Sequence, residues 1–262
     1  MAHPLADKVV VITGASAGIG RATAFALAKC GAKPALLART ESLLSDVAER
    51  CKRYKAPEVG KFVCDVRNEK SVEQTMAAVL KQFGQIDVLI NNAGLSLNGD
   101  VDGYSLSDWQ TVLETNLTGT FLTCRAVLPA MKKQGGGQII NISSGAGRDG
   151  IKGMAAYCAA KFGVVGFTES LGLEVRDQNI RVSVLLPGSV ATGFSRIARR
   201  KERSGEHSSI GATTSVDIGY SMTPDEVASV IVSMLEQPPQ AWMSEVVLRP
   251  LNLELRRTRT KG

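Results

Sequence analysis

Short apolar segments of strand length alternate with longer segments of helical periodicity along most of the chain. This alternation favours βαβ units, in which helices cover both faces of a parallel sheet. The sequence therefore predicts an α/β fold with a doubly wound sheet of seven parallel strands. The strand segments are residues 8–13, 33–38, 61–65, 86–91, 138–143, 180–186 and 245–248.

Six helices are predicted between these strands, at residues 19–29, 41–53, 69–83, 106–133, 156–178 and 224–237. Thr223 and Pro224 are typical of a helix start, because they place a capping hydroxyl before a proline at the first helical position. Pro129 has no N–H group to donate, so we expect it to end or bend the long helix in which it lies.

Length and composition indicate an ordinary globular protein of 262 residues, 44% of them hydrophobic and 21% charged. An α/β chain of this length forms one continuous core, so we expect a single domain over residues 1–262. The apolar runs are far shorter than the roughly 20 residues that cross a bilayer. The first residues lack the pattern of a secretion signal. We therefore expect a cytoplasmic protein that does not enter a membrane.

Reactive side chains exclude several kinds of site. The five cysteines are scattered and form no C-x-x-C pair, which fits free thiols in a reducing compartment. The two histidines, His3 and His207, are too few for a histidine metal cage or a Ser-His-Asp triad. We therefore expect no metal site.

Positive charge is concentrated near the end of the chain. The formal net charge is +6, and residues 256–262 include four arginine and lysine side chains. We interpret this segment as a solvated basic tail and expect no nucleic-acid binding, although the tail is the one feature that would support it. Residues 190–222 are irregular and rich in Ser, Gly, Thr and Arg. A loop of this length predicts a substrate lid, with a surface insertion as the alternative.

A glycine-rich turn follows the first predicted strand and opens the first predicted helix. It contains Gly14, Gly18 and Gly20 in the segment TGASAGIG. Glycines allow the backbone to turn tightly beside a pyrophosphate, and the helix start behind them offers unpaired N–H groups and a positive dipole end. The turn therefore predicts a dinucleotide site, although a plain structural turn is an alternative for the turn taken alone.

The motifs of the chain, in their order, resemble those of the short-chain dehydrogenase/reductase family. They are TGASAGIG at 13–20, CDV at 64–66, NNAG at 91–94, Asn116 in NLTG, NISSGAG at 141–147, YCAAK at 157–161 and PGSVAT at 187–192. The resemblance covers nearly the whole chain. It implies a Rossmann-like fold, a nicotinamide cofactor and hydride transfer between that cofactor and a carbonyl or secondary alcohol. By the same resemblance the catalytic residues are Asn116, Ser144, Tyr157 and Lys161.

The resemblance also implies a set of residues that bind the cofactor. Asp65 and Val66 are expected against the adenine, while Asn91 is expected either to line the cleft or to brace the sheet. Thr192 is expected near the nicotinamide amide. The full set is Gly14, Ser16, Gly18, Ile19, Gly20, Arg39, Asp65, Val66, Asn92, Ala93, Gly94, Tyr157, Lys161, Pro187, Gly188, Val190 and Thr192.

Charge after the second strand predicts which nicotinamide cofactor is used. An acidic side chain there would bind the ribose 2′-hydroxyl of NAD, whereas an arginine would attract the 2′-phosphate of NADP. Ala38 stands where NAD-preferring relatives carry aspartate, and Arg39 follows it. NADP(H) is therefore predicted over NAD(H). The prediction depends on Arg39, because Ala17 occupies the place of the second basic residue found in many NADP-using relatives.

Tyr157 and Lys161 are four residues apart on a predicted helix, so they share one face. A positive charge beside a phenol favours the phenolate and brings its pKa towards the working range. The resemblance implies that Tyr157 gives a proton to the alkoxide in reduction and removes it in oxidation. Ser144, 13 residues before Tyr157, would bind the same oxygen. Asn116 would bind a water that links Lys161 to solvent.

The substrate stays open between a 3-oxoacyl compound, a 3-hydroxy acid and a broad range of ketones or aldehydes. The basic residues Arg196, Arg199, Arg200, Lys201 and Arg203 would meet an acidic substrate or form a solvated helix face. The chain ends without the glycine-rich segment common among 3-oxoacyl reductases, which disfavours the first class. A homodimer or homotetramer is expected from the resemblance. A cofactor-binding regulator or scaffold with the same fold is the alternative to an enzyme.

Overall fold

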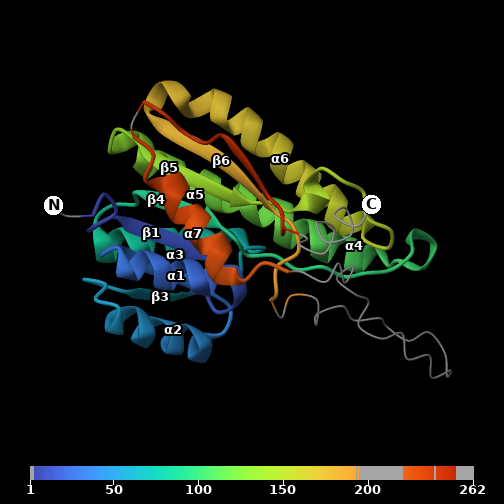
Figure 1. Cartoon of the computed structure of the whole chain (residues 1–262), viewed down its shortest axis with the longest axis horizontal. Helices are drawn as coiled ribbons and strands as arrows, with labels where there is room; N and C mark the ends of the chain where they lie inside the picture. Colours follow the sequence, from blue (N-terminus) through green and yellow to red (C-terminus); the bar gives the residue numbers. More distant parts are fainter. Residues whose placement is uncertain (1–2, 193, 195–220, 239, 252–262) are drawn as a thin grey trace, which may run out of the picture.

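The computed structural model describes residues 3–192, 194, 221–238 and 240–251. Its centre is a sheet of seven parallel strands in the order β3-β2-β1-β4-β5-β6-β7 (Figure 1). This order confirms the predicted doubly wound, Rossmann-like sheet, and it reverses between β1 and β4. The strands are β1 (Val9–Thr13), β2 (Lys33–Ala38), β3 (Gly60–Val63), β4 (Val88–Asn91), β5 (Gly137–Ile142), β6 (Ile180–Pro187) and β7 (Glu245–Leu248).

Helices cover both faces of the sheet because alternate residues of each strand point to opposite sides. Along β1, Val10 and Ile12 pack with α1, α2 and α7, whereas Val9 and Val11 pack with α3, α5 and α6. Each face is thereby closed by its own layer of apolar side chains. The helices are α1 (Gly18–Lys29), α2 (Glu41–Arg53), α3 (Glu69–Phe83), α4 (Leu106–Leu113), α5 (Gly119–Lys133), α6 (Ala155–Val175) and α7 (Pro224–Leu235).

The prediction of one uninterrupted helix over residues 106–133 is wrong in one respect. A π-helical turn at Glu114–Thr118 separates α4 from α5, so the segment is interrupted where Asn116 lies. Of the two effects expected of Pro129, an end of the helix is excluded, because α5 continues to Lys133. Val127 and Met131 on either side of Pro129 are fully buried, and this packing holds the helix together across the missing hydrogen bond.

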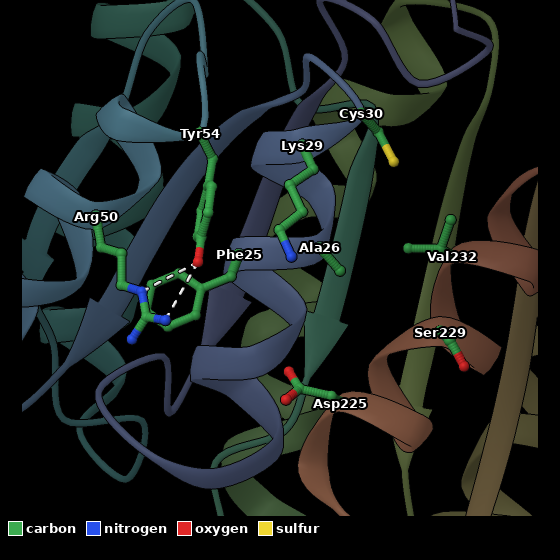
Figure 2. A pocket seen from close by; sticks show the side chains of 9 residues that line it. All are labelled: Phe25, Ala26, Lys29, Cys30, Arg50, Tyr54, Asp225, Ser229 and Val232. Carbon is green, nitrogen blue, oxygen red and sulfur yellow. Dashed lines mark hydrogen bonds between the residues drawn. The ribbon is translucent and has the colours of Figure 1, made fainter.

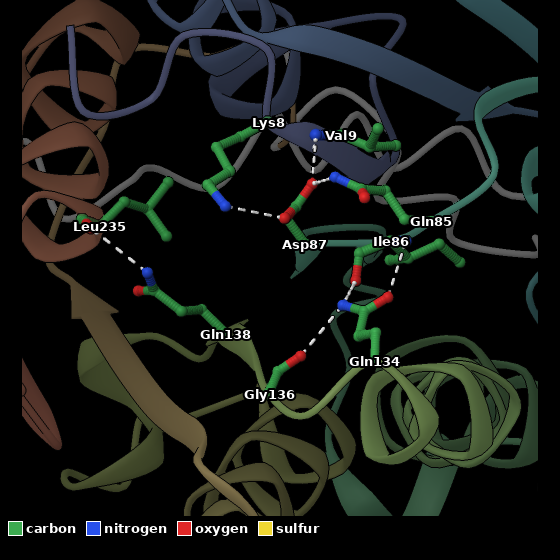
Figure 3. Close-up of polar contacts among 9 residues, drawn as sticks. All are labelled: Lys8, Val9, Gln85, Ile86, Asp87, Gln134, Gly136, Gln138 and Leu235. Atoms are coloured by element: carbon green, nitrogen blue, oxygen red, sulfur yellow. Dashed lines mark hydrogen bonds and ion pairs between the residues drawn. The ribbon is translucent and has the colours of Figure 1, made fainter. Parts of the chain in front are cut away.

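Polar side chains close the edge of the sheet at which the strands begin (Figure 3). The Asp87 carboxylate accepts hydrogen bonds from Lys8 Nζ at 3.0 Å and from the Val9 amide at 2.8 Å. Gln134 at the end of α5 binds both the amide and the carbonyl of Ile86. Ligands bind at the carboxyl ends of the strands in sheets of this type. These contacts therefore lie at the opposite edge, away from the expected site.

Four buried polar side chains join β4 and β5 to the helices behind them. Asn91 Nδ2 donates to Asn141 Oδ1 at 2.9 Å, and Asn141 Nδ2 donates to Thr168 Oγ1 of α6 at 2.9 Å. Thr123 of α5 donates to Asn91 Oδ1 at 2.6 Å. Asn91 therefore braces the sheet, which was one of the two roles expected for it. Within the described residues, no helix is both long and apolar enough to span a bilayer.

Replacing Asn141 by Leu should lower the free energy of unfolding by about 1–3 kcal/mol, because the buried amide of Asn91 loses its oxygen acceptor and keeps only the weaker acceptor Cys124 Sγ. Thr168→Val keeps the shape of the side chain and removes only the acceptor of Asn141 Nδ2 from this network, so it should lower the free energy of unfolding by less. Urea unfolding followed by circular dichroism measures both. Unfolding midpoints equal to that of the wild type would show that the network adds nothing to stability.

Candidate active site

Tyr157 and Lys161 lie one turn apart near the start of α6, with 8% and 4% of their surfaces exposed. Lys161 Nζ is 5.6 Å from the centroid of the Tyr157 ring. Ser144 follows β5 and caps a short 3-10 turn, where its hydroxyl accepts a hydrogen bond from the Ala146 amide at 3.2 Å. The structure thus brings these three predicted residues together at the carboxyl ends of the strands.

The Lys161 ammonium is buried against the end of β5. Nζ donates to the Ile142 carbonyl at 2.9 Å, and the backbone carbonyl of Lys161 accepts a hydrogen bond from Ser143 Oγ at 2.9 Å. Burial lowers the pKa of Lys161 to about 8, since the charged form loses its hydration. The side chain is therefore mostly protonated at neutral pH. Ser143 is the first residue after β5, and this hydrogen bond fixes α6 to the end of that strand.

The Tyr157 hydroxyl is held in its neutral form. Burial raises the pKa of Tyr157 to about 12, and a hydrogen bond with Ser144 opposes this rise. The ring packs against Phe194, with the ring centroids 5.8 Å apart. The phenol of Tyr157 is consequently protonated at neutral pH in the unliganded protein.

Asn116 owes its position to the π-helical turn between α4 and α5. Its Nδ2 donates to the carbonyls of Leu95 and Val112, each at 2.8 Å. Its Oδ1 is buried and has no hydrogen-bond partner in the described part of the chain. A Cβ added to Gly94 would lie 2.6 Å from this oxygen and 3.8 Å from Lys161 Nζ. The unpaired oxygen and the ammonium therefore face the same small space beside Gly94.

The glycine turn has the backbone that a bound pyrophosphate requires. Gly14 and Gly18 have positive φ values of 64° and 53°, which side chains disfavour. A Cβ on Gly20 would lie 2.5 Å from Asn92 Nδ2 and from the Gly14 carbonyl oxygen. The capping residue of α1, Ala17, offers no side-chain hydrogen bond, and the first turn carries no acidic residue. The positive end of α1 is thus open to an anion.

Other predicted cofactor residues surround this turn. A Cβ on Gly14 would lie 2.9 Å from Ala93 Cα, and a Cβ on Gly18 would lie 3.3 Å from Thr192 Cγ2. The segment after β6 is held by the Gly188 amide, which donates to the Leu248 carbonyl at 2.7 Å. The chain beyond β4 and the chain beyond β6 therefore both approach the glycine turn. Ser16 is half-buried, and Ile19 packs on the core beneath α1.

The chain ends of β2 and β3 carry the charged residues of the site. The Cys64 amide donates to the Ala38 carbonyl at 3.0 Å, so Arg39 and Asp65 follow neighbouring strand ends. Arg39 is exposed, and Val66 is buried against the start of α5. Arg67 binds the Asp65 carboxylate and was not predicted from the sequence. The spacing D-x-R at 65–67 is the sequence feature that could have indicated this pair. The hydrogen bond from Arg67 lowers the pKa of Asp65 more than burial raises it, so this pKa lies below its ordinary value.

Two ion pairs connect the turn after Ser144 to the last strand. Arg148, which ends this turn, pairs with Glu245 of β7. Asp149 pairs with Arg249 just beyond β7 at 3.4 Å. Neither pair was predicted, because the partners are about a hundred residues apart in the chain.

Most of the lid predicted at 190–222 lies outside the described residues, and so do all five of its basic side chains. The basic tail at 256–262 also lies outside them.

A groove of about 420 Å³ lies elsewhere, between α1, α2 and α7 (Figure 2). Arg50 donates to the Tyr54 hydroxyl at 3.2 Å and covers the Phe25 ring at 4.6 Å. None of the residues lining this groove is a predicted site residue, so it is separate from the site around Tyr157.

Comparisons with known proteins agree with this geometry. A family model described as short chain dehydrogenase matches residues 8–203. The chain belongs to this family. An uncharacterized oxidoreductase of Staphylococcus saprophyticus is 35% identical over 247 residues, which cover 94% of this chain and 99% of that protein. A 3-oxoacyl-acyl-carrier-protein reductase of Vibrio cholerae is 35% identical over 240 residues, covering 92% and 94%.

A solved structure is also similar over nearly the whole chain. A variant of actinorhodin polyketide ketoreductase with NADPH has a TM-score of 0.82 and 33% identity, over 93% of this chain and 95% of that one. This short-chain dehydrogenase is therefore an oxidoreductase by family, and the motifs at 13–20 and 157–161 lie within the matched segment.

Burial of Lys161 in this short-chain dehydrogenase should show itself in the pH dependence of stability. Its pKa is about 8 in the folded chain, below the ordinary value of 10.5. Between these values the unfolded chain binds more protons, so this lysine's contribution to the free energy of unfolding rises as pH rises through that window. Relative to Lys161→Met, the wild type should gain about 3 kcal/mol across it.

Urea unfolding of both proteins at intervals from pH 7 to pH 10.5 measures this difference. The comparison cancels contributions from other titrating groups and from the lost contact with Ile142. A difference between the two proteins that stays constant with pH would show that Lys161 keeps an ordinary pKa.

Proposed function

We propose that the protein is an NADP(H)-dependent oxidoreductase that transfers a hydride between the nicotinamide and a carbonyl or secondary alcohol. The observation that carries this proposal is the buried arrangement of Tyr157, Lys161 and Ser144 at the edge of the sheet where the glycine turn lies. A proton donor, a cation and a hydrogen-bonding hydroxyl converge there, as reduction of a carbonyl requires. The polyketide ketoreductase with NADPH supports the same cofactor.

The residues present fit a nicotinamide dinucleotide. Gly14 and Gly18 leave room for the pyrophosphate, and the start of α1 provides amide donors and a positive dipole end. Lys161 would hold the nicotinamide ribose, and Arg39 would meet the 2′-phosphate. Asp65 and Val66 would lie at the adenine. When bound, the nicotinamide supplies the hydride to a carbonyl carbon or accepts it from an alcohol carbon.

Tyr157 carries the proton of the reaction. In reduction its hydroxyl gives the proton to the alkoxide that forms on the substrate, and in oxidation its phenolate removes the proton from the alcohol. The pKa of about 12 in the unliganded protein favours the donor form. The buried ammonium of Lys161 stabilises the phenolate left after donation, since the two groups are close and shielded from water.

Ser144 and Asn116 support this transfer in different ways. Ser144 lies beside Tyr157 and would donate a hydrogen bond to the same substrate oxygen, which stabilises charge at the reacting atom. Asn116 has a buried oxygen free to bind a water beside Lys161. Such a water would return a proton to Tyr157 through Lys161 after each reduction.

The substrate is proposed to be a ketone. The Vibrio cholerae relative and the actinorhodin neighbour are both named as reductases of ketone groups. We also propose a homo-oligomer, because Phe121 of α5 and Phe162 and Leu173 of α6 expose large apolar side chains.

Replacing Tyr157 by Phe should lower kcat for ketone reduction with NADPH at least about 100-fold, because the proton donor is lost while the ring contacts remain. The dissociation constant for NADPH should stay within about threefold. Tyr54→Phe, in the groove between α1, α2 and α7, removes a hydroxyl far from the site and is the matched control. Turnover of the Tyr157 variant near the wild-type rate would exclude the acid–base role.

Replacing Arg39 by Asp should reverse the cofactor preference. The wild type is expected to bind NADPH more tightly than NADH, and the carboxylate should repel the 2′-phosphate and bind the 2′-hydroxyl instead. The ratio of the two dissociation constants should shift by more than about tenfold, which calorimetric titration measures. Equal or tighter binding of NADH by the wild type would mean that Arg39 points to solvent. Failure to bind either cofactor would favour a scaffold role.

A further inference from the structure

Three charged side chains meet at the proposed adenine end of the cofactor site. Arg39 directly follows β2, and Asp65 lies two residues beyond β3. The hydrogen bond from the Cys64 amide to the Ala38 carbonyl keeps the two chain segments in step as they leave the sheet. A free carboxylate at Asp65 would therefore stand next to the guanidinium that the proposed function assigns to the 2′-phosphate.

Arg67 engages that carboxylate on both oxygens. Its Nε lies 3.0 Å from Oδ1 of Asp65, its Nη2 lies 2.6 Å from Oδ2, and its backbone amide donates to Oδ1 at 3.1 Å. The two side chains are about one-third exposed, at 34% and 31%. Paired, two-point contacts between arginine and a carboxylate are the strongest and most directional of the common ion pairs.

Arg39, in contrast, forms no ion pair among the residues that the structure describes. The three side chains together carry one net positive charge, and the pairing of Asp65 with Arg67 leaves that charge on Arg39. Without Arg67, the Asp65 carboxylate would pair with Arg39 or repel a phosphate, and the net charge of the corner would be zero. The lowered pKa of Asp65, to which Arg39 also contributes, is consistent with this proximity.

We propose that Arg67 determines cofactor specificity by neutralising Asp65, which keeps Arg39 available for the 2′-phosphate of NADP(H). The inference rests on the proposed function, because it requires a 2′-phosphate at this corner. Arg67 acts here through Asp65 and is a positioning residue; it need not touch the cofactor. The role predicts that Arg67 becomes dispensable once the carboxylate is removed.

Four variants test this charge arrangement: Arg67→Ala, Asp65→Asn, the double variant with both changes, and Arg67→Lys. Dissociation constants for NADPH and NADH are measured by calorimetry, and the ratio of NADH to NADPH cancels any general disturbance of the adenine site. Arg67→Ala should lower the ratio about tenfold, since it restores a negative charge beside the phosphate. Asp65→Asn should raise the ratio, and the double variant should return it to near the wild-type value.

Arg67→Lys is the matched control, because it keeps the charge and should keep most of the preference. The effect of Arg67→Ala should shrink when salt is raised from about 50 mM to 500 mM, as expected for a partly exposed charge. A double variant with a ratio as low as that of Arg67→Ala would overturn the inference, because Arg67 would then contact the phosphate itself. The inference would also be overturned if Arg67→Ala left the ratio of the NADH and NADPH dissociation constants unchanged.

A failure of the proposed function gives a different result. If the wild type binds NADH as tightly as NADPH, the ratio is already near one, and both the NADP(H) preference and the inference fall together. If the wild type prefers NADPH and only the Arg67 series departs from expectation, the proposed cofactor stands and the role of Arg67 alone is rejected.

Discussion

The burial of one ammonium group organises the site. Lys161 is charged near neutral pH although it is almost fully buried, and removing a cation from water in this way is costly unless partners compensate. The compensation comes from the Ile142 carbonyl at the end of β5. The Ser143 hydroxyl fixes the backbone of the same residue. Because β5 holds Lys161 and also leads into Ser144, one strand end sets the position of the cation, the hydroxyl and, through α6, the phenol.

The fold was predictable because its signals are local. Each strand is a short apolar run, and Val9 to Ile12 are buried from both sides by helices whose own apolar faces are visible in the sequence. The glycine turn and the spacing of Tyr157 and Lys161 were equally local, so the sequence predicted which residues the structure would bring together. The family resemblance then added Asn116 and Ser144, which lie outside the helix that carries Tyr157 and Lys161.

What the sequence did not reveal depends on contacts between distant segments. No local pattern predicted the π-helical turn at Glu114–Thr118. In this turn Asn116 binds the Leu95 carbonyl, which belongs to the segment after β4 and is distant in sequence. Pro129 was expected to end or bend the helix, and α5 continues past it to Lys133 with buried side chains on both sides of the proline. Asp65 and Arg67 are two residues apart, yet their pairing was not predicted. Its proposed effect on the cofactor depends on Arg39, which only the pairing of β2 with β3 brings near Asp65.

The ion pairs between the Ser144 turn and the β7 region join segments that are made at different times during synthesis. Arg148 and Asp149 pair with Glu245 and Arg249, which are among the last described residues of the chain. All the residues proposed to react, the last of which is Lys161, therefore precede these two partners in the chain. Earlier strands can pair as they emerge, whereas these two ion pairs can form only after β7 has been made. A nascent chain that stalls before β7 would contain all the residues proposed to react, while the turn beside Ser144 would lack both of these ion pairs.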